Sequence, residues 1–261
     1  MHSCPWLTLV PVPYATVHLH VGIYAPPGAE PDTGVTLNST YMEQWAKAQF
    51  TRFFAAGFTA DQLTTFALAD EPGWYFPAEA PEHFMNASLG ARAAALKAEW
   101  QAFLAKNKVT GIASEPSTAR WQLNGLAEKK LFYWSSRFSS YSSAVAFGRA
   151  TAAMEVATRK GAPIYVNFNN FAGRGYVPGP VGNNRDKTNP DAAMLSLDWF
   201  EFGRARGSTL MWTEDWFGDS AASQWGYYGA RLRSASRLAP SKDVIHGGYL
   251  LCSRAGGSHS V

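Results

Sequence analysis

Two acidic segments, each at the end of a short apolar run, are the residues of this chain best suited to chemistry. The first run, 64–69, is followed by Asp70 and Glu71 and then by Pro, Gly, Trp and Tyr. The second run, 208–213, is followed by Glu214 and another acid, and then by Trp and Phe. Short apolar runs predict buried strands, so each acidic segment is expected at a strand end beside aromatic rings. Two carboxylates presented in this way are what cleavage of a glycosidic bond requires.

The two glutamates are predicted to have different roles. Glu71 is the expected general acid/base, which protonates the leaving oxygen and later deprotonates water. Glu214 is the expected nucleophile, which forms a covalent glycosyl-enzyme. The structural alternatives are a solvated turn for the Asp-Glu-Pro-Gly segment and a helix N-cap for Glu214.

Further side chains near predicted strand ends are candidates for binding a sugar. Amides offer donors and acceptors for hydroxyl groups, and indole rings offer flat apolar faces to a pyranose ring. The candidate sugar-binding residues are Asp70, Trp74, Trp134, Tyr165, Asn167, Asn169, Asn170, Arg174, Trp212, Asp215 and Trp216. Amides that cap a loop backbone and indoles that pack in a core are the alternatives. Arg174 lies in a polar loop of about 20 residues, a length typical of functional loops.

Strand-like and helix-like segments alternate along the chain. Apolar runs predict strands at 17–24, 64–69, 131–134, 163–168, 208–213 and 244–251. Periodic apolar positions and capping residues predict helices at 41–56, 91–105, 143–159, 190–206 and 220–238. The first of these helices has a capping box, formed by Thr40 and Glu43, and Gly57 at the position of a C-cap.

This alternation predicts an α/β fold with a parallel sheet covered by helices. No glycine-rich phosphate-binding motif follows a strand, and the polar signals lie at several strand ends, as in a (β/α)8 TIM-type barrel. We therefore expect one barrel domain over 1–261 rather than an open doubly wound sheet. Six strands are recognisable instead of eight. The first strands are expected either to be missing at the N-terminus or to be irregular and hidden before Tyr14.

The acidic motifs resemble those of the clan of retaining glycoside hydrolases built on a (β/α)8 barrel, and of its β-galactosidase-like members in particular. The resemblance implies an acid/base Glu at the end of the fourth strand, usually after Asn, and a nucleophile Glu at the end of the seventh. Asp70-Glu71-Pro72-Gly73 is similar to the first motif and Trp212-Thr213-Glu214-Asp215 to the second. Asp70 replaces the Asn that binds the sugar 2-hydroxyl in the family. The resemblance covers the chain from about residue 15 to the end.

Composition agrees with one folded domain and argues against two classes of partner, whereas the expected carbohydrate substrate comes from the motifs and from the resemblance. The chain is 46% hydrophobic and 16% charged, which is not typical of disorder. The net charge of +3 includes no basic run, so no nucleic-acid partner is expected. No stretch approaches 18 apolar residues, so no membrane partner is expected either.

Two cysteines, Cys4 and Cys252, do not make a disulfide framework or a zinc site. The N-terminus does not resemble a signal peptide, and the compartment is left open.

Two other function classes stay open. A non-catalytic or degenerate carbohydrate-binding barrel would keep the aromatic and amide residues without turnover. A metal-dependent hydrolase would use His18 and His20, which share a strand face, with His246 as a further ligand. The glycosidase interpretation needs no metal and no organic cofactor.

Overall fold

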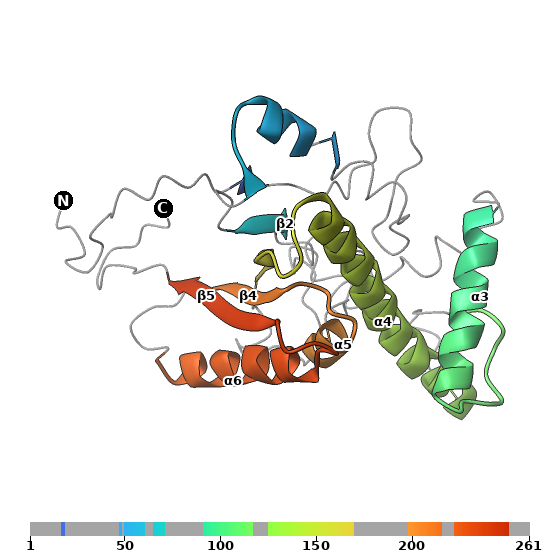
Figure 1. Cartoon of the computed structure of the whole chain (residues 1–261). Coiled ribbons are helices and arrows are strands. Elements are labelled where there is room, and N and C mark those ends of the chain that lie inside the picture. Colours follow the sequence, from blue (N-terminus) through green and yellow to red (C-terminus); the bar gives the residue numbers. More distant parts are fainter. Residues whose placement is uncertain are drawn as a thin grey trace, which may run out of the picture.

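The computed structural model describes residues 17–18, 47–48, 50–60, 65–70, 91–116, 125–169, 198–215 and 222–250. Strands and helices alternate along this part of the chain (Figure 1). The strands are β1 (Val17–His18), β2 (Phe66–Asp70), β3 (Ile164–Asn169), β4 (Leu210–Asp215) and β5 (Ile245–Leu250). The helices are α3 (Ala91–Lys106), α4 (Leu126–Ala157), α5 (Trp199–Arg204) and α6 (Ala222–Leu238), and residues 50–55 are also helical.

The five strands form one parallel sheet in the order β1-β2-β3-β4-β5. Each strand therefore pairs with the next strand along the chain. A doubly wound sheet contains a point at which the strand order reverses, and the described strands contain no such reversal. Because all five strands run the same way, their carboxyl ends lie at one edge of the sheet.

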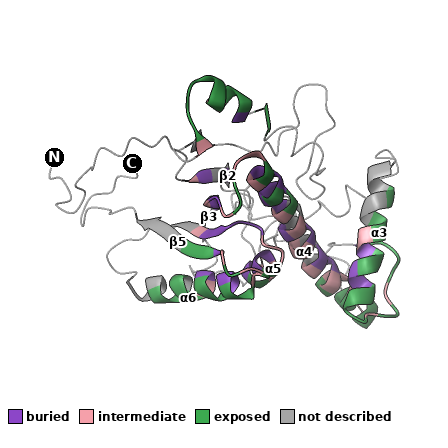
Figure 2. Cartoon of the chain, viewed as in Figure 1, coloured by how far each residue is buried: buried purple, intermediate pink, exposed green. Residues whose placement is uncertain are grey.

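The described helices that pack on the sheet share one core with one of its faces. This core includes Phe66 and Leu68 of β2, Ile164 and Val166 of β3, Met211 of β4, Phe50, Phe147 and Met154, Trp199 and Phe202 of α5, and Leu232 of α6. The strand residues in it alternate, as the two-residue period of a strand requires. Tyr165 and Leu210 are buried separately, with Trp212 packed against them, on the opposite face. Figure 2 shows buried residues interspersed with exposed ones along α4 and α6.

The predicted strand at 131–134 is wrong, because this segment lies inside the 32-residue helix α4. Its apolar side chains continue a helical spacing through Phe138 and Tyr141, and they pack against α3 rather than in the sheet. Trp100, Phe103 and Phe138 form the buried centre of this second, smaller core. The predicted helix at 143–159 is the C-terminal half of α4.

The predicted helix at 190–206 is described only from residue 198 onward, because its N-terminal part, 190–197, lies outside the described residues. Asp198 has an extended backbone (φ −100°, ψ 110°), and α5 begins at the next residue. The Asp198 carboxylate accepts hydrogen bonds from the backbone N–H groups of Phe200 and Glu201, at 2.8 and 3.2 Å. A carboxylate at this position satisfies amides that lack a helical partner, so it fixes where the helix begins.

The other predicted elements are confirmed where the structure describes them. Predictions at 91–105, 163–168, 208–213, 220–238 and 244–251 correspond to α3, β3, β4, α6 and β5, with shifts of one or two residues. The helix predicted at 41–56 is described at 47–48 and 50–55, and Gly57 follows it with φ +88°, as a C-cap glycine requires.

Glycines allow α4, α5 and α6 to approach closely. A Cβ atom on Gly148 of α4 would overlap the carbonyl oxygen of Ala205, and one on Gly203 of α5 would overlap that of Ala235. The helices therefore pack backbone against backbone at these two positions. No described helix is long and apolar enough to cross a membrane.

Candidate functional site

The carboxyl ends of β2, β3 and β4 bring the predicted polar residues to one edge of the sheet. Asp70 pairs with Asn167, and Asn169 pairs with Glu214. Neighbouring strands are about 4.8 Å apart, so the β2 and β4 backbones lie about 10 Å apart with β3 between them. This edge therefore places one acidic strand end on each side of an asparagine strand.

The two-residue period of the strands assigns these positions to one face. Positions 165, 167 and 169 fall on the same face of β3, and positions 210, 212 and 214 fall on the matching face of β4. This is the face that carries the Tyr165 and Trp212 rings, whose centroids are 4.9 Å apart with an interplanar angle of 40°. The Asn and Glu positions thus continue, toward the strand ends, the face that begins with an aromatic pair.

A β-bulge in β2 decides which face Asp70 occupies. Ala67 pairs with Tyr165, but Ala69 pairs with Val166, so the register shifts around Leu68. Without this extra residue, position 70 would pair with Phe168 and would fall on the helix-covered face. With it, Asp70 takes the register position of Asn167. Bulges are common beside active sites because they redirect a residue in this way.

Six further predicted site residues are not placed at this edge by the described structure. Trp134 is wrong as a strand-end platform: it lies on α4, where its ring packs edge-on against Phe103 with centroids 6.1 Å apart. Five residues lie outside the described part of the chain, namely Glu71, Trp74, Asn170, Arg174 and Trp216.

The sheet register separates one predicted site residue, Asp215, from this face and adds one residue that was not predicted, Tyr249. Asp215 follows Glu214 and shares the register face of Met211, which is buried under the helices. The neighbouring acids Glu214 and Asp215 therefore belong to opposite faces. Tyr249 of β5 pairs with Glu214 and was not among the predicted site residues. Its signal in the sequence was its place near the end of the last apolar run.

The resemblance to the glycosidase clan implied two strands between the acidic strands, and the sheet contains one. The segment at 131–134 was the expected additional strand, and it is part of α4. β3 pairs directly with both β2 and β4, so one strand separates the two acidic strands. In that clan, two strands separate the fourth strand from the seventh.

The titratable groups with shifted pKa values in the described chain lie at the opposite, N-terminal edge of the sheet. Arg206, before β4, forms ion pairs with Glu155 of α4 and with Asp243 before β5. Its Nη2 atom is 2.8 Å from Glu155 Oε1 and 2.6 Å from Asp243 Oδ2, and its Nε donates to the Ser241 hydroxyl at 2.9 Å.

These contacts determine the direction of each pKa shift. Hydrogen bonding to Glu155 is the largest cause of the raised pKa of Arg206. Burial alone would raise the pKa of Glu155, but hydrogen bonds from Arg206 and from the Gly161 N–H, with the Arg206 charge, lower it overall. A hydrogen bond with Ser241, followed by the contacts with Arg206, lowers the pKa of Asp243. The cluster joins α4 to the segments before β4 and β5, which is a structural role.

The residues proposed for a metal-dependent hydrolase are not brought together in the described chain. His18 is on β1, and His246 is on β5, at the opposite side of the five-stranded sheet. His20 lies outside the described residues. Where the structure is described, no group of three His, Cys, Asp or Glu residues is placed to hold a metal ion.

We compared the chain with known protein families, curated proteins and solved structures. No family model, curated protein or solved structure matches this chain significantly.

Proposed function

We propose that this protein hydrolyses a glycosidic bond at the carboxyl edge of its parallel sheet, with two carboxylates and no cofactor. The observation that carries the proposal is the register of β2, β3 and β4. It sets Asp70 opposite Asn167, and Glu214 opposite Asn169, on one face and at one edge. Acidic residues on both sides of an amide pair suit a sugar ring, because carboxylates supply the chemistry and amides bind the hydroxyl groups.

In the proposed mechanism, Glu214 attacks the anomeric carbon while Glu71 protonates the departing glycosidic oxygen. The C–O bond to the leaving group breaks as the bond to the Glu214 carboxylate forms. Glu71, now ionised, then takes a proton from water, and the water oxygen displaces Glu214 from the anomeric carbon. Asp70, one residue before Glu71, accepts a hydrogen bond from a sugar hydroxyl.

The fold proposed for this site is a (β/α)8-type barrel. Two observations support it: the sequential order of five parallel strands, and the packing of the described sheet-covering helices on one face. In a barrel the helices lie outside and the other face points inward, so the Tyr165–Trp212 pair would be part of the interior. The catalytic edge would then be the carboxyl edge, where barrel enzymes have their active sites.

The aromatic pair would provide an apolar surface below the site. Tyr165 is buried, and Trp212 is partly exposed against it. An indole with one exposed side offers a flat face to the C–H groups of a sugar. Binding without turnover would therefore still be expected if the carboxylates proved inactive, which is the second proposed function.

Adjacent acids on opposite faces give the sharpest test of the proposal. We expect the wild-type chain to cleave at least one member of a panel of chromogenic glycosides. Glu214→Gln should lower kcat/KM by at least about 10³-fold, or about 4 kcal/mol of transition-state stabilisation, because it removes the nucleophile. Asp215→Asn makes the same chemical change one residue later and should stay within about tenfold of the wild type.

The product and the unreactive variant decide between the alternatives. Proton NMR of the fresh product shows whether the anomeric configuration is retained or inverted. Retention supports a covalent intermediate on Glu214, whereas inversion would make Glu214 a general base instead. If Glu214→Gln keeps full activity, the catalytic assignment is wrong. If the wild type cleaves nothing but binds oligosaccharides by calorimetry, the protein is a binding module.

A further inference from the structure

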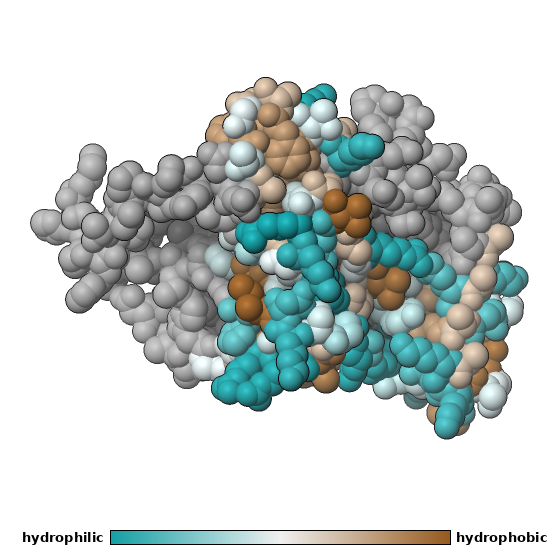
Figure 3. Space-filling model, in the orientation of Figure 1, coloured by the Kyte–Doolittle hydropathy of each residue, from teal (hydrophilic) through white to brown (hydrophobic). Residues whose placement is uncertain are grey.

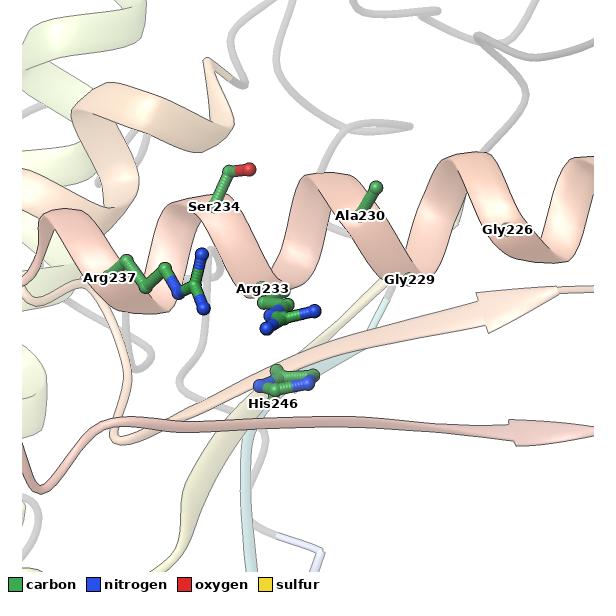
Figure 4. Close-up of a pocket in the computed structure, with 7 residues that line it drawn as sticks. All are labelled: Gly226, Gly229, Ala230, Arg233, Ser234, Arg237 and His246. Atoms are coloured by element: carbon green, nitrogen blue, oxygen red, sulfur yellow. The ribbon is translucent and has the colours of Figure 1, made fainter.

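A groove between α6 and β5 lies away from the proposed catalytic edge. It has a volume of about 520 Å³, within the range of small-molecule sites. It is lined by Gly226, Gly229, Ala230, Arg233, Ser234, Arg237 and His246 (Figure 4). His246 pairs with Met211, whose side chain is buried under the helices, so the groove lies on the helix-covered side of the sheet.

The groove is cationic. Arg233 and Arg237 are one helical turn apart and project from the side of α6 that faces the strand carrying His246 (Figure 4). Neither arginine forms an ion pair with a described acidic residue, whereas Arg204 and Arg206 do. In the orientation of Figure 1, hydrophilic residues gather over this part of the molecule (Figure 3).

The two arginines and the two glycines of the groove are unfavourable for the stability of α6. Like charges four residues apart on a helix repel each other. Glycines inside a helix are also unfavourable, and a Cβ atom on Gly226 or Gly229 would meet no atom within 4 Å, so packing does not require glycine there. Local choices that oppose stability without a compensating contact are typical of functional sites.

We propose that this groove binds a small molecule that carries a phosphate group. Two guanidinium groups one turn apart offer paired donors that match phosphate oxygens, and His246 offers a further nitrogen donor from the facing strand. The phosphate lies between Arg233, Arg237 and His246. The rest of the ligand extends over the surface left open by Gly226 and Gly229. This site is independent of the proposed glycosidase activity.

Arg231 provides the matched control on the same helix. At 100° per residue it lies on the other side of α6 from Arg233, and its guanidinium is 5.3 Å from the centroid of the Tyr227 ring. Arg231→Gln therefore removes the same charge as Arg233→Gln without changing the groove. Binding that depends on net charge alone would respond equally to both substitutions.

The experiment is calorimetric titration of the full chain with inorganic phosphate and with glucose 6-phosphate at low ionic strength, with glucose as the uncharged control. We expect saturable binding of glucose 6-phosphate, tighter than that of phosphate, and no binding of glucose. Arg233→Gln and Arg237→Gln should each weaken the Kd at least tenfold, while Arg231→Gln should leave it within twofold. Circular dichroism of each variant checks that α6 is still folded.

Two results would overturn the proposal. The first is the absence of saturable phosphate or glucose 6-phosphate binding by the wild type. The second is an equal loss of binding in Arg231→Gln and Arg233→Gln, which would show a general charge effect. If an arginine variant does not fold, His246→Gln on the strand side is titrated instead, and it should also weaken the Kd.

Discussion

At the scale of single residues, the register of the sheet assigns the neighbouring acids Glu214 and Asp215 to different faces. Glu214 shares the register face of Trp212, and Asp215 shares that of Met211. In the first acidic segment, the bulge around Leu68 gives Asp70 the register position of Asn167. A sequence motif does not contain this information, because one inserted residue exchanges the two faces of a strand.

Asp70 and Glu71 should therefore respond differently to amide substitution. Glu71→Gln removes the proposed general acid/base and should lower kcat by about 10²–10⁴-fold. Asp70→Asn keeps a hydrogen-bond acceptor and adds a donor, so kcat/KM should change by less than about tenfold. Initial rates on the best chromogenic substrate measure both.

The pH profile of the same variants provides the control. Glu71→Gln should remove the alkaline limb of the kcat profile, because that limb reports ionisation of the acid. Should Asp70→Asn remove the limb and Glu71→Gln keep it, Asp70 is the acid/base and the assignment within this pair is reversed.

At the scale of elements, the helix packing requires glycine at one position in a helix and not at another. A Cβ atom on Gly203 of α5 would overlap the Ala235 carbonyl oxygen of α6, whereas one on Gly229 of α6 would meet nothing within 4 Å. Both residues are glycines in helices, and only their tertiary surroundings differ.

The same substitution at these two glycines should have effects of opposite sign. Gly203→Ala should lower the free energy of unfolding by about 1–3 kcal/mol, because α5 and α6 must separate. Gly229→Ala should raise it by up to about 1 kcal/mol, because alanine favours the helix and nothing obstructs its methyl group. Urea denaturation of both variants measures the two values. Equal effects would show that α5 and α6 do not pack as described.

At the scale of the whole molecule, the Arg206 cluster links parts of the chain that are far apart in sequence. It joins Glu155 at the end of α4 to Asp243 before β5, and the Arg206 side chain is 17% exposed. Arg206 itself has φ +53°, a conformation that is unfavourable for a residue with a side chain. The ion pairs hold it in this position.

This cluster predicts a loss of stability in acid. The pKa values of Glu155 and Asp243 are lowered from ordinary values of 4.5 and 3.8. A lowered pKa in the folded state contributes stability above the ordinary pKa, and this contribution is lost as pH falls through the folded value. The free energy of unfolding should therefore be steady near neutrality and should fall as pH drops below about 4.5.

Arg206→Gln tests the origin of this acid sensitivity. It leaves two partly buried carboxylates without their partner, so it should lower the free energy of unfolding at pH 7 by about 2–3 kcal/mol. It should also reduce the dependence on pH below 4.5. Arg204→Gln is the control, because that side chain is 52% exposed in its ion pair with Glu201, and it should cost less than about 1 kcal/mol. Equal losses in the two variants would exclude a special role for the cluster.

The sequence predicted most of the helices and strands, because the signals for them are local. Apolar runs located β3, β4 and β5, and capping residues such as Gly57 located helix ends. It failed at 131–134, where four residues are too few to distinguish a strand from one turn of a helix. The contact of Trp134 with Phe103 on α3 settles this segment as helix.

Tertiary structure alone decided which residues meet. The sequence predicted acids and amides at strand ends, but the sheet order made β3 the single strand between β2 and β4. The bulge around Leu68 then assigned Asp70 to the face of Asn167, and packing on α6 left Arg233 and Arg237 in a groove. Strand pairing and helix packing depend on contacts between distant segments, and local sequence patterns do not encode these contacts.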